Sequence, residues 1–583
     1  MSDTPPKFNP QSEIASCDLL LHYLEKIGVE FIFGIPGGAI EPLYNALAKS
    51  EKRGGIRAIT ARHETGAVFM ADAYARNTGK LGVCCSTTGP GATNMITGIA
   101  SSYENNTPLL IITPQTAQDK VGKKAMQESG DTGIDITSIF QLFTKYSSYI
   151  THVEQFEHKL VSAIMSAFSS PPGPTHLSIP NDILKSTIPI NQQPINIANV
   201  IRHPVLKDEN AIQDLLTELN NSKKTIFVVG AGAKNCSDLL ADCINKMGIE
   251  FVATPDGKGF INPNHPSYRG VIGFAGHKSA SKALQQDTVD TIVVIGSALG
   301  EFTSNAWDQL SLLNNKLIHI DSNQENFTRS SMAKLQVGGH IPTILEAVLD
   351  NCSTLVKDKK ETPAKTLTED NKFLYFEFDE PAKTTDASSP LKPQYLMTQL
   401  TQVFPANARY LADTGNNLAW AIHYLNPSDR HSGNTDLIQI CAEFCSMGWS
   451  VGSAIGTALA HPNDPIICIV GDGSFLMSGN EITVALQENL NIIFLIMNDQ
   501  HLGMVKHGQL LNKSADIANK LPNISYALMA SAMGIASQTV ETANELLNLD
   551  IAQMCNRNGP TLLDIRIDAE EIPPIATRLK GLK

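Results

Sequence analysis

Two apolar segments joined by one predicted helix constrain this chain more than any other feature. Ile466–Val470 is a continuous apolar run, typical of a strand buried on both faces of a parallel sheet. It is followed by a Gly-Asp-Gly-Ser turn at 471–474 and a helical stretch from about 478 to 489. A second apolar run, Ile492–Met497, then ends in Asn-Asp. The pattern predicts a βαβ unit with a right-handed crossover.

The ends of these two strands predict a metal and diphosphate site. Both strands run the same way, so Asp472 and Asp499 should meet at the carboxyl edge of the sheet, where open α/β sheets bind ligands. Neighbouring carboxylates repel unless a cation separates them, and Mg²⁺ combines one or two carboxylates with phosphate oxygens. Gly471 and Gly473 let the backbone approach a diphosphate, and a helix N-terminus beyond Ser474 favours the anion. The alternative is that the tripeptide alone is only a tight turn.

The rest of the chain has the alternation of strands and helices that is typical of parallel α/β layers. The predicted strands form three groups, which are 31–33, 81–85 and 109–112; 225–229, 291–295 and 316–320; and 410–411, 465–470, 492–497 and 561–567. Polar, Pro-containing stretches at about 186–208 and 352–392 separate the groups and are interpreted as linkers. We therefore expect three doubly wound parallel-sheet domains, at 12–185, 200–350 and 393–570, with a linker at 351–392 and a tail at 571–583.

Composition excludes several classes of protein. A length of 583 residues suits three or four domains, and a net charge of −13 argues against a nucleic-acid partner. The ten cysteines are too sparse for a disulfide scaffold and form no CxxC spacing, which favours reduced thiols in a reducing compartment. The first eleven residues carry no signal or transit pattern, and no run of 18 apolar residues occurs. We expect a cytoplasmic protein with no membrane span.

The Gly-Asp-Gly segment followed after about 25 residues by Asn-Asp resembles the thiamine-diphosphate motif. The resemblance implies that Asp472 and Asp499 bind Mg²⁺ through their side chains and that His501 binds it through its backbone carbonyl. Two more segments of this domain match. One carries the residues implied to hold the terminal phosphates, Gly415, Asn416 and Asn417. The other places Met447 where the family has a bulky residue that holds the cofactor in a V shape, although plain core packing is the alternative.

Three segments of the first predicted domain resemble the pyrimidine-binding domain of acetolactate synthases. They are 34–40, with Pro36 and Gly37; 61–64, where Glu64 opens a helix; and 88–94, with Pro90 and Asn94. The resemblance implies that Glu64 hydrogen-bonds the pyrimidine N1′ and favours the imino tautomer, whose nitrogen removes the C2 proton. A lone Glu at a helix start would otherwise only interact with the helix dipole.

The resemblance to acetolactate synthases covers nearly the whole chain. It implies that Gln127 and Lys145 line the substrate channel, although Lys145 could be an ordinary surface lysine. It also implies that a segment over the thiazolium comprises Leu502, Gly503, Met504 and Val505. In this family the activating glutamate and the metal site come from different subunits. A homodimer or homotetramer with active sites at the subunit interface is therefore expected.

Three departures from the biosynthetic acetolactate synthases affect cofactor and substrate. Their flavin-binding Arg-Phe-Asp-Asp-Arg run is replaced by the segment 296–302, and the spacing to Trp307 looks more like the flavin-free catabolic enzymes. FAD is therefore not expected. Gly508 stands in place of the tryptophan that selects 2-ketobutyrate, and Met126 replaces a phenylalanine of the channel. These two changes leave the acceptor, and with it the donor, open.

The expected activity is that of a thiamine-diphosphate-dependent transferase or lyase. A 2-keto acid such as pyruvate would lose CO₂, and the resulting enamine would attack a second keto acid. A non-oxidative 2-keto-acid decarboxylase, or a carboligase for a larger substrate, is the nearest alternative, and the lack of any His-His pair disfavours the decarboxylase. A flavin-dependent oxidase is another. A non-catalytic relative should lack Glu64, Asp472 or Asp499, and the single Gly-Ala-Gly at 230–232 is weak support for a dehydrogenase.

Overall fold

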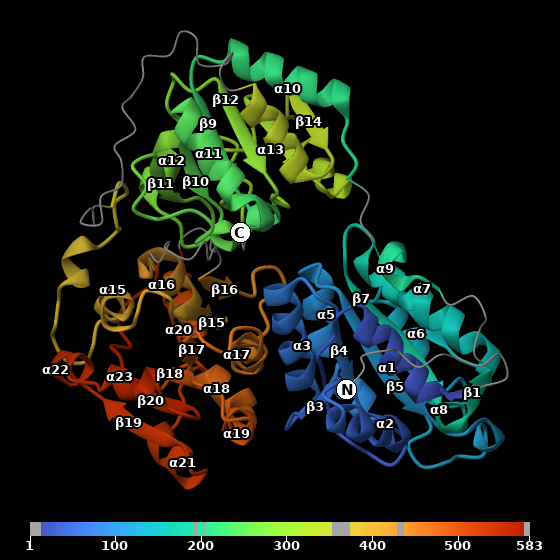
Figure 1. Cartoon of the computed structure of the whole chain (residues 1–583). Coiled ribbons are helices and arrows are strands. Elements are labelled where there is room, and N and C mark those ends of the chain that lie inside the picture. The colour runs from blue at the N-terminus through green and yellow to red at the C-terminus, as the bar shows by residue number, and fades with distance from the viewer. Residues whose placement is uncertain (1–12, 190–194, 202–204, 352–373, 428–436, 576–583) are drawn as a thin grey trace. The chain divides into compact units, whose positions relative to one another are not determined.

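A computed structural model of the chain describes residues 13–189, 195–201, 205–351, 374–427 and 437–575 (Figure 1). The chain divides into two compact units. The first comprises 1–203, 443–462 and 478–490, and the second comprises 204–442, 463–477 and 491–583. In the described part of the chain, we find no helix with the length and apolar character of a transmembrane span.

The first unit is built on a six-stranded parallel sheet in the order β3-β2-β4-β5-β7-β6. Its strands are β2 (Phe31–Gly34), β3 (Arg57–Thr60), β4 (Gly82–Cys85), β5 (Leu109–Gln115), β6 (Tyr146–Tyr149) and β7 (Pro174–Pro180). Its helices are α1 (Ser16–Lys26), α2 (Glu41–Lys52), α3 (Glu64–Thr78), α4 (Pro90–Asn94), α5 (Ile96–Glu104), α6 (Ile136–Gln141), α7 (Phe156–Phe168), α8 (Asn181–Lys185) and α9 (Ile197–Val200), with α17 (Trp449–Ala460) and α19 (Ile482–Gln487) from later in the chain. A small antiparallel ribbon pairs β1 (Glu13–Ala15) with β8 (Thr187–Pro189).

The second unit holds two more six-stranded parallel sheets. The central one has the order β11-β10-β9-β12-β13-β14 and the C-terminal one β16-β15-β17-β18-β20-β19. The central elements are α10 (Glu209–Asn221), β9 (Thr225–Val229), α11 (Ser237–Met247), β10 (Glu250–Ala253), β11 (Tyr268–Val271), α12 (Lys278–Leu284), β12 (Thr291–Ile295), β13 (Leu317–Asp321), β14 (Leu335–Gly338) and α13 (Ile341–Asp350). The C-terminal elements are α15 (Pro393–Val403), β15 (Arg409–Ala412), α16 (Asn416–Tyr424), β16 (Ile438–Ile440), β17 (Ile466–Gly471), α18 (Asp472–Ser478), β18 (Ile492–Asn498), α20 (Gly503–Leu511), α21 (Tyr526–Ala532), β19 (Ala536–Val540), α22 (Ala543–Leu547), α23 (Ile551–Cys555) and β20 (Thr561–Arg566).

The predicted fold class is confirmed, because each of the three sheets is parallel throughout and every predicted strand is present. The strands that the sequence did not reveal are mostly polar or bounded by proline. β6 reads Tyr-Ser-Ser-Tyr and is only half-buried at the edge of its sheet, while β7 begins and ends in proline. Such strands lack the apolar run that marks a buried one, and proline is tolerated at strand ends.

Two predictions of local structure need correction. The helix after the Gly-Asp-Gly turn begins at Asp472 itself, not beyond Ser474, and a 3₁₀ turn at Gly479–Glu481 separates it from α19. The predicted helix at 478–489 is therefore not one continuous helix. It corresponds to the end of α18, the 3₁₀ turn and α19. The first predicted linker also contains a strand, because Thr187–Pro189 pairs with β1. Residues 190–194, 202–204 and 352–373 of the two linkers, and the first twelve residues, lie outside the described part of the chain.

Helices α3 and α17 pack against each other unusually closely within the first unit. A Cβ added at Gly456 would lie 2.1 Å from the carbonyl oxygen of Met70, and one at Gly452 would lie 3.0 Å from the Cβ of Phe69. The Trp449 indole donates a hydrogen bond of 3.2 Å to the buried Asp72 carboxylate. Glycine is required here because the two helix backbones leave no room for a side chain. The pair forms a rigid support beneath the N-terminus of α3.

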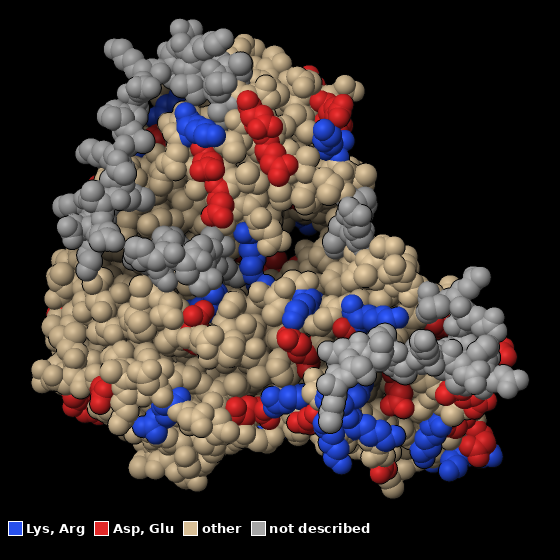
Figure 2. All heavy atoms as spheres, viewed as in Figure 1, with Lys and Arg blue, Asp and Glu red and all other residues tan. Residues whose placement is uncertain are grey.

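The surface carries mixed charge. On the face drawn in Figure 2, acidic and basic side chains are interspersed. Some are paired, such as Arg53 with Glu25 at 2.7 Å. Interspersed charges of both signs are an ordinary arrangement on a protein surface.

Candidate active site

The two predicted metal-binding carboxylates are both oriented by backbone amides at the carboxyl edge of the C-terminal sheet. β17 and β18 are neighbours in parallel register, with Gly471 opposite Met497, so Asp472 and Asp499 follow the ends of adjacent strands. Asp472 is 2% exposed, and its two oxygens accept hydrogen bonds of 2.8 Å from the N–H groups of Gly473 and Gln500. The Asp499 carboxylate accepts one of 2.9 Å from the N–H of His501.

Electrostatics at this edge favours a cation. Burial, reinforced by the charge of Asp499, raises the pKa of Asp472 to about 7. Burial also raises the pKa of Asp499 to about 6. Both carboxylates are therefore costly to ionise as they stand, and a divalent ion would relieve that cost. Among the described residues, no three His, Cys, Asp or Glu side chains gather as ligands. Two carboxylates completed by carbonyl, phosphate and water oxygens suit Mg²⁺.

His501 is predicted to bind the metal through its carbonyl, and the position of its ring is compatible with that prediction. Its Nδ1 lies 2.6 Å from the carbonyl oxygen of Asp499. A nitrogen at that distance from a carbonyl must donate its proton, so it cannot at the same time be a metal ligand.

The residues predicted to hold the diphosphate lie next to this carboxylate pair. A Cβ added at Gly503 would lie 2.4 Å from the Asn416 Nδ2 and 2.6 Å from the Asp499 Oδ2. The Asn416 amide nitrogen donates to the His507 Nδ1 at 3.0 Å, while its buried Oδ1 has no hydrogen-bond partner among the described residues. Gly415 precedes it at φ 120°, a conformation that favours glycine. The structure thus brings the starts of α16 and α20 together with Asp499.

The rest of the predicted thiazolium and wedge residues are more exposed. Val505 is 45% exposed on α20, whereas Met504 packs against the core of the domain. A Cβ added at Gly508 would meet no atom within 4 Å, so the space that a larger side chain would occupy is open. Met447, in the first unit, is 38% exposed beside Gly448, which begins α17 at φ 83°. A large apolar side chain in that position is available for contact with a ligand.

The predicted activating glutamate is buried at the first turn of α3, in the first unit. Glu64 is 7% exposed, and its Oε2 accepts a hydrogen bond of 2.9 Å from the Asn94 amide. A Cβ added at Gly91 would lie 3.2 Å from its Oε1, so the glycine keeps that oxygen accessible. Pro90 opens α4 behind Gly89, whose φ is 66°. A Cβ added at Gly37, near Pro36, would collide with Thr87 at 2.7 Å, so the segments 34–40 and 88–94 lie together.

A further carboxylate, Glu481, lies under Glu64 and was not found from the sequence. It is 2% exposed and accepts hydrogen bonds from the N–H groups of His63 (2.8 Å) and Arg62 (3.1 Å). Burial raises its pKa to about 7, and the charge of Glu64 adds to this effect. Nothing in its local sequence distinguishes it from a surface glutamate, because its partners are backbone groups far away along the chain.

The two predicted channel residues, Gln127 and Lys145, contact different segments of the first unit. Gln127 is exposed at φ 59°, and its carbonyl accepts a hydrogen bond of 3.1 Å from the Thr88 hydroxyl, next to the 88–94 segment. The Lys145 ammonium instead donates to the carbonyl and hydroxyl oxygens of Ser169, both at 2.6 Å, and to the carbonyl of Pro171. These contacts lie just beyond the end of α7, and the place of Lys145 in a substrate channel stays a prediction.

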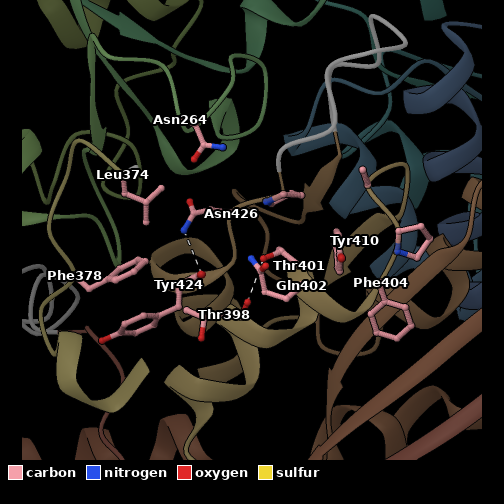
Figure 3. A pocket seen from close by; sticks show the side chains of 13 residues that line it. Asn264, Leu374, Phe378, Thr398, Thr401, Gln402, Phe404, Tyr410, Tyr424 and Asn426 are labelled. Carbon is pink, nitrogen blue, oxygen red and sulfur yellow. Dashed lines mark hydrogen bonds between the residues drawn. The ribbon is translucent and has the colours of Figure 1, made fainter. Parts of the chain in front are cut away.

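A separate cavity of about 380 Å³ lies in the second unit (Figure 3). It is lined by residues that include Asn264, Phe378, Gln402, Tyr424 and Asn426. Tyr424 ends α16, whereas the diphosphate residues begin it, so the cavity is at the other end of that helix. It belongs to neither carboxylate site.

Comparison with known proteins identifies the family of the chain. Residues 16–135, 212–348 and 413–565 match the N-terminal TPP-binding, central and C-terminal TPP-binding domains of the thiamine pyrophosphate enzymes. The chain belongs to this family, and it is a thiamine-diphosphate-dependent enzyme.

Within the family, the chain is similar to acetolactate synthases. It is 29% identical to the acetolactate synthase isozyme 1 large subunit of Escherichia coli (strain K12), over 97% of each chain. It is 28% identical to a probable acetolactate synthase large subunit of Methanococcus aeolicus, over 96% of this chain and 93% of the relative. It is also 28% identical to an acetolactate synthase of Arthrospira platensis, over 95% and 94%.

Proposed function

We propose that this enzyme decarboxylates a 2-keto acid, pyruvate in the first instance, and ligates the remaining fragment to a second keto acid, as an acetolactate synthase does. The observation that carries the proposal is the pair of buried carboxylates, Asp472 and Asp499, at adjacent strand ends. Their raised pKa values and amide-fixed orientation suit a divalent cation. Similarity over nearly the full length of acetolactate synthases supports the choice of reaction.

The residues of the chain have distinct tasks in this proposal. Asp472, Asp499 and the carbonyl of His501 would hold Mg²⁺, and Asn416 with the N-terminus of α20 would hold the diphosphate. Thiamine diphosphate, when bound, supplies a carbon nucleophile and an electron sink. Glu64 would hold a proton at the pyrimidine N1′ through its accessible Oε1, while Asn94 fixes its other oxygen. The chain thus binds, orients and controls protonation.

We also propose that FAD is not part of this enzyme. A doubly wound sheet binds dinucleotides at its topological switch point, here between β9 and β12. There, Gly232 donates a hydrogen bond of 2.8 Å to the carbonyl of Gly296, and a Cβ added at Gly230 would lie 2.4 Å from the same oxygen. The backbone segments that follow the two strands are therefore packed directly against each other.

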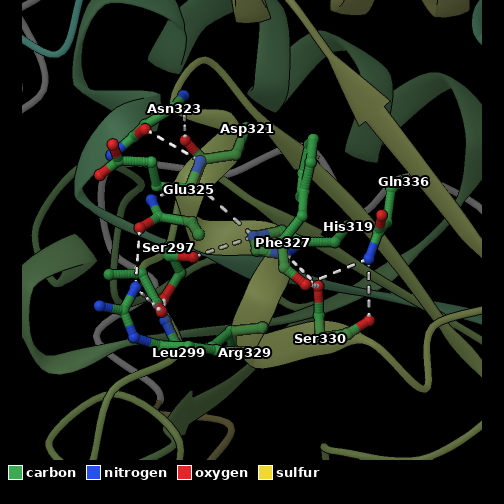
Figure 4. A network of polar contacts seen from close by, with 12 residues as sticks. Ser297, Leu299, His319, Asp321, Asn323, Glu325, Phe327, Arg329, Ser330 and Gln336 are labelled. Atoms are coloured by element: carbon green, nitrogen blue, oxygen red, sulfur yellow. Dashed lines mark hydrogen bonds and ion pairs between the residues drawn. The ribbon is translucent and has the colours of Figure 1, made fainter.

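The acid nearest that edge is also engaged by its own domain (Figure 4). Asp321 accepts hydrogen bonds from the N–H of Asn323 (2.7 Å) and the amide of Asn326 (3.2 Å). The buried His319 beside it bonds the Ser330 hydroxyl (2.8 Å) and the Ser297 carbonyl (2.9 Å). An acid with these partners is poorly placed to bind a ribose, which supports the absence of a flavin.

A homodimer or homotetramer in the cytoplasm is proposed as the working form. The family resemblance implies that Glu64 of one subunit would meet the metal site of another. Large apolar side chains are exposed in both units, among them Met126 and Leu528, and would be covered in such an assembly. The nine cysteines of the described residues are free, which suits a reducing compartment.

Product analysis tests the reaction. Purified protein would be given thiamine diphosphate, Mg²⁺ and pyruvate, with and without FAD, beside Glu64→Gln. We expect acetolactate without FAD, its rate reduced at least 100-fold in the variant because the proton control at N1′ is lost. Release of aldehyde in place of acetolactate would replace the synthase by a simple decarboxylase. Failure to consume pyruvate would redirect the search to larger keto acids that use the open space at Gly508.

A further inference from the structure

A buried tyrosine packs against the helix that begins with Asp472, and its hydroxyl has no hydrogen-bond partner among the described residues. Tyr526 opens α21 and is 1% exposed. Its backbone N–H donates a hydrogen bond of 3.0 Å to Asp564, whose other oxygen accepts one of 2.8 Å from the Asn498 amide. Its ring meets Phe475 edge-on, with centroids 5.5 Å apart. Phe475 lies on the helix that begins with Asp472, and Asn498 directly precedes Asp499.

The hydroxyl of Tyr526 has no hydrogen-bond partner among the residues that the structure describes. Buried polar groups are nearly always paired, because an unpaired one loses its bonds to water without replacement. Tyr410, another buried tyrosine of the same domain, follows the rule, since its hydroxyl donates to the carbonyl of Leu400 at 3.2 Å. The hydroxyl of Tyr526 is therefore open to a group outside the described residues, such as a bound ligand.

The charges around Tyr526 indicate what that group is. Burial raises its pKa, and the carboxylate of Asp472 raises it further, followed by those of Asp564 and Asp499. The phenol thus stays protonated and remains a donor. An anionic or metal-bound oxygen held by the nearby Asp472 or Asp499 would serve as its acceptor. Phenylalanine in place of tyrosine would fill the same space without that capacity.

We propose that the Tyr526 hydroxyl is a positioning group of the metal–diphosphate site, donating a hydrogen bond to an oxygen that the metal carries, either water or phosphate. The inference rests on the proposed metal site at Asp472 and Asp499 and deepens it. Ligand-free protein has the hydroxyl unpaired, and bound ligand pairs it. The bond therefore contributes to ligand affinity and adds nothing to the stability of the ligand-free chain.

Three variants test this assignment by binding and melting measurements that do not need turnover. In Tyr526→Phe, the Kd of thiamine diphosphate in the presence of Mg²⁺, measured by calorimetry, should rise about ten-fold, the effect of one lost charge-assisted hydrogen bond. The melting temperature of ligand-free Tyr526→Phe should not fall. The matched control Tyr410→Phe should show the reverse, a lower melting temperature by about 2 °C and an unchanged Kd.

Titration with Mn²⁺ alone identifies the acceptor. Weaker Mn²⁺ binding by Tyr526→Phe assigns the bond to metal-bound water, and an effect only with thiamine diphosphate assigns it to a phosphate oxygen. Unchanged affinities in both arms, or a lower melting temperature of ligand-free Tyr526→Phe, would overturn the inference. The third variant, Asp472→Asn, separates this outcome from failure of the proposed function. If it too binds as the wild type does, the metal site itself is wrong.

Discussion

At the scale of single residues, the buried carboxylates differ in what compensates their burial. Asp472 and Asp499 have one or two backbone amides each, burial raises the pKa of both, and the charge of Asp499 raises the pKa of Asp472 further. Glu64 has one amide partner and one accessible oxygen. Glu481 has only backbone N–H groups and carries the loop that presents Glu64. The first three carboxylates are the ones that we propose to contact ligands, whereas Glu481 bonds the backbone of the loop before Glu64.

The raised pKa of Glu481 makes a prediction about stability and pH. The folded-state pKa of about 7 lies above the ordinary value of 4.5, so folding favours the protonated form. Its contribution to the free energy of unfolding is therefore present below pH 4.5 and is lost as the pH rises to about 7. A shift of this size corresponds to about 3 kcal/mol. Glu481→Gln, which is neutral at every pH, should lack this loss.

Urea unfolding at pH 5 and pH 8 checks the prediction. The wild type should lose more stability than Glu481→Gln between the two pH values, by about 3 kcal/mol. Because all other titrating groups are common to both proteins, the difference isolates Glu481. Equal losses in the two proteins would show that its carboxylate ionises without cost in the folded chain.

At the scale of elements, the helix that begins with Glu64 is held by close backbone packing, with glycines where larger side chains would not fit. α3 is buried along most of its length, and glycine and alanine alternate with larger side chains from Gly66 to Ala75. Gly452 and Gly456 lie one turn apart on α17 and admit the backbone of α3. Glu481 fills the position beside Gly66, where a Cβ would lie 2.4 Å from its Oε1. The glycines are therefore determined by contacts between elements and by no feature of their own helices.

Two helical glycines offer a matched test of this packing. Gly456→Ala should lower the free energy of unfolding by about 2 kcal/mol, because its methyl group would force the helices apart. Gly508→Ala should raise it by about 0.5–1 kcal/mol, since its Cβ would meet nothing and alanine favours a helix. Denaturant unfolding of both variants measures the two changes. Similar values would show that helix propensity alone governs both positions.

At the scale of the whole molecule, ligand binding and stability are linked. The carboxylate pair and the unpaired Asn416 Oδ1 are costly in the ligand-free chain. A ligand that satisfies these groups binds only the folded state and must stabilise it. Thiamine diphosphate with Mg²⁺ at 100 times its Kd should therefore add about 2.7 kcal/mol to the free energy of unfolding.

Thermal melting with and without ligand tests this linkage. The wild type should melt at a higher temperature when Mg²⁺ and thiamine diphosphate are added, and EDTA should abolish the gain. Asp499→Asn should keep the melting temperature of the ligand-free protein but show a smaller gain on ligand addition. A wild-type melting temperature that does not change on ligand addition would contradict the proposed binding site.

The sequence by itself determined the class of fold, the strand ends that carry Asp472 and Asp499, and the position of Glu64 at the start of α3. These features are local, since a buried parallel strand is a run of apolar residues, and both aspartates directly follow such runs. The start of the helix at Asp472 was missed by a few residues, because three residues of a Gly-Asp-Gly turn carry no helical periodicity. The polar edge strands β6 and β19 were missed for lack of an apolar run.

Only the tertiary structure decided how distant residues complete the site. Glu481 meets the loop before Glu64 across more than 400 residues of chain, Gly456 meets Met70, and the hydroxyl of Tyr526 has no hydrogen-bond partner among the described residues. Lys145 likewise contacts Ser169 just beyond the end of α7, and its place in a substrate channel, which the family resemblance implies, stays a prediction. The physical reason is the same in each case. Burial and hydrogen bonding depend on which surfaces meet in space, and sequence spacing records only the neighbours within one element.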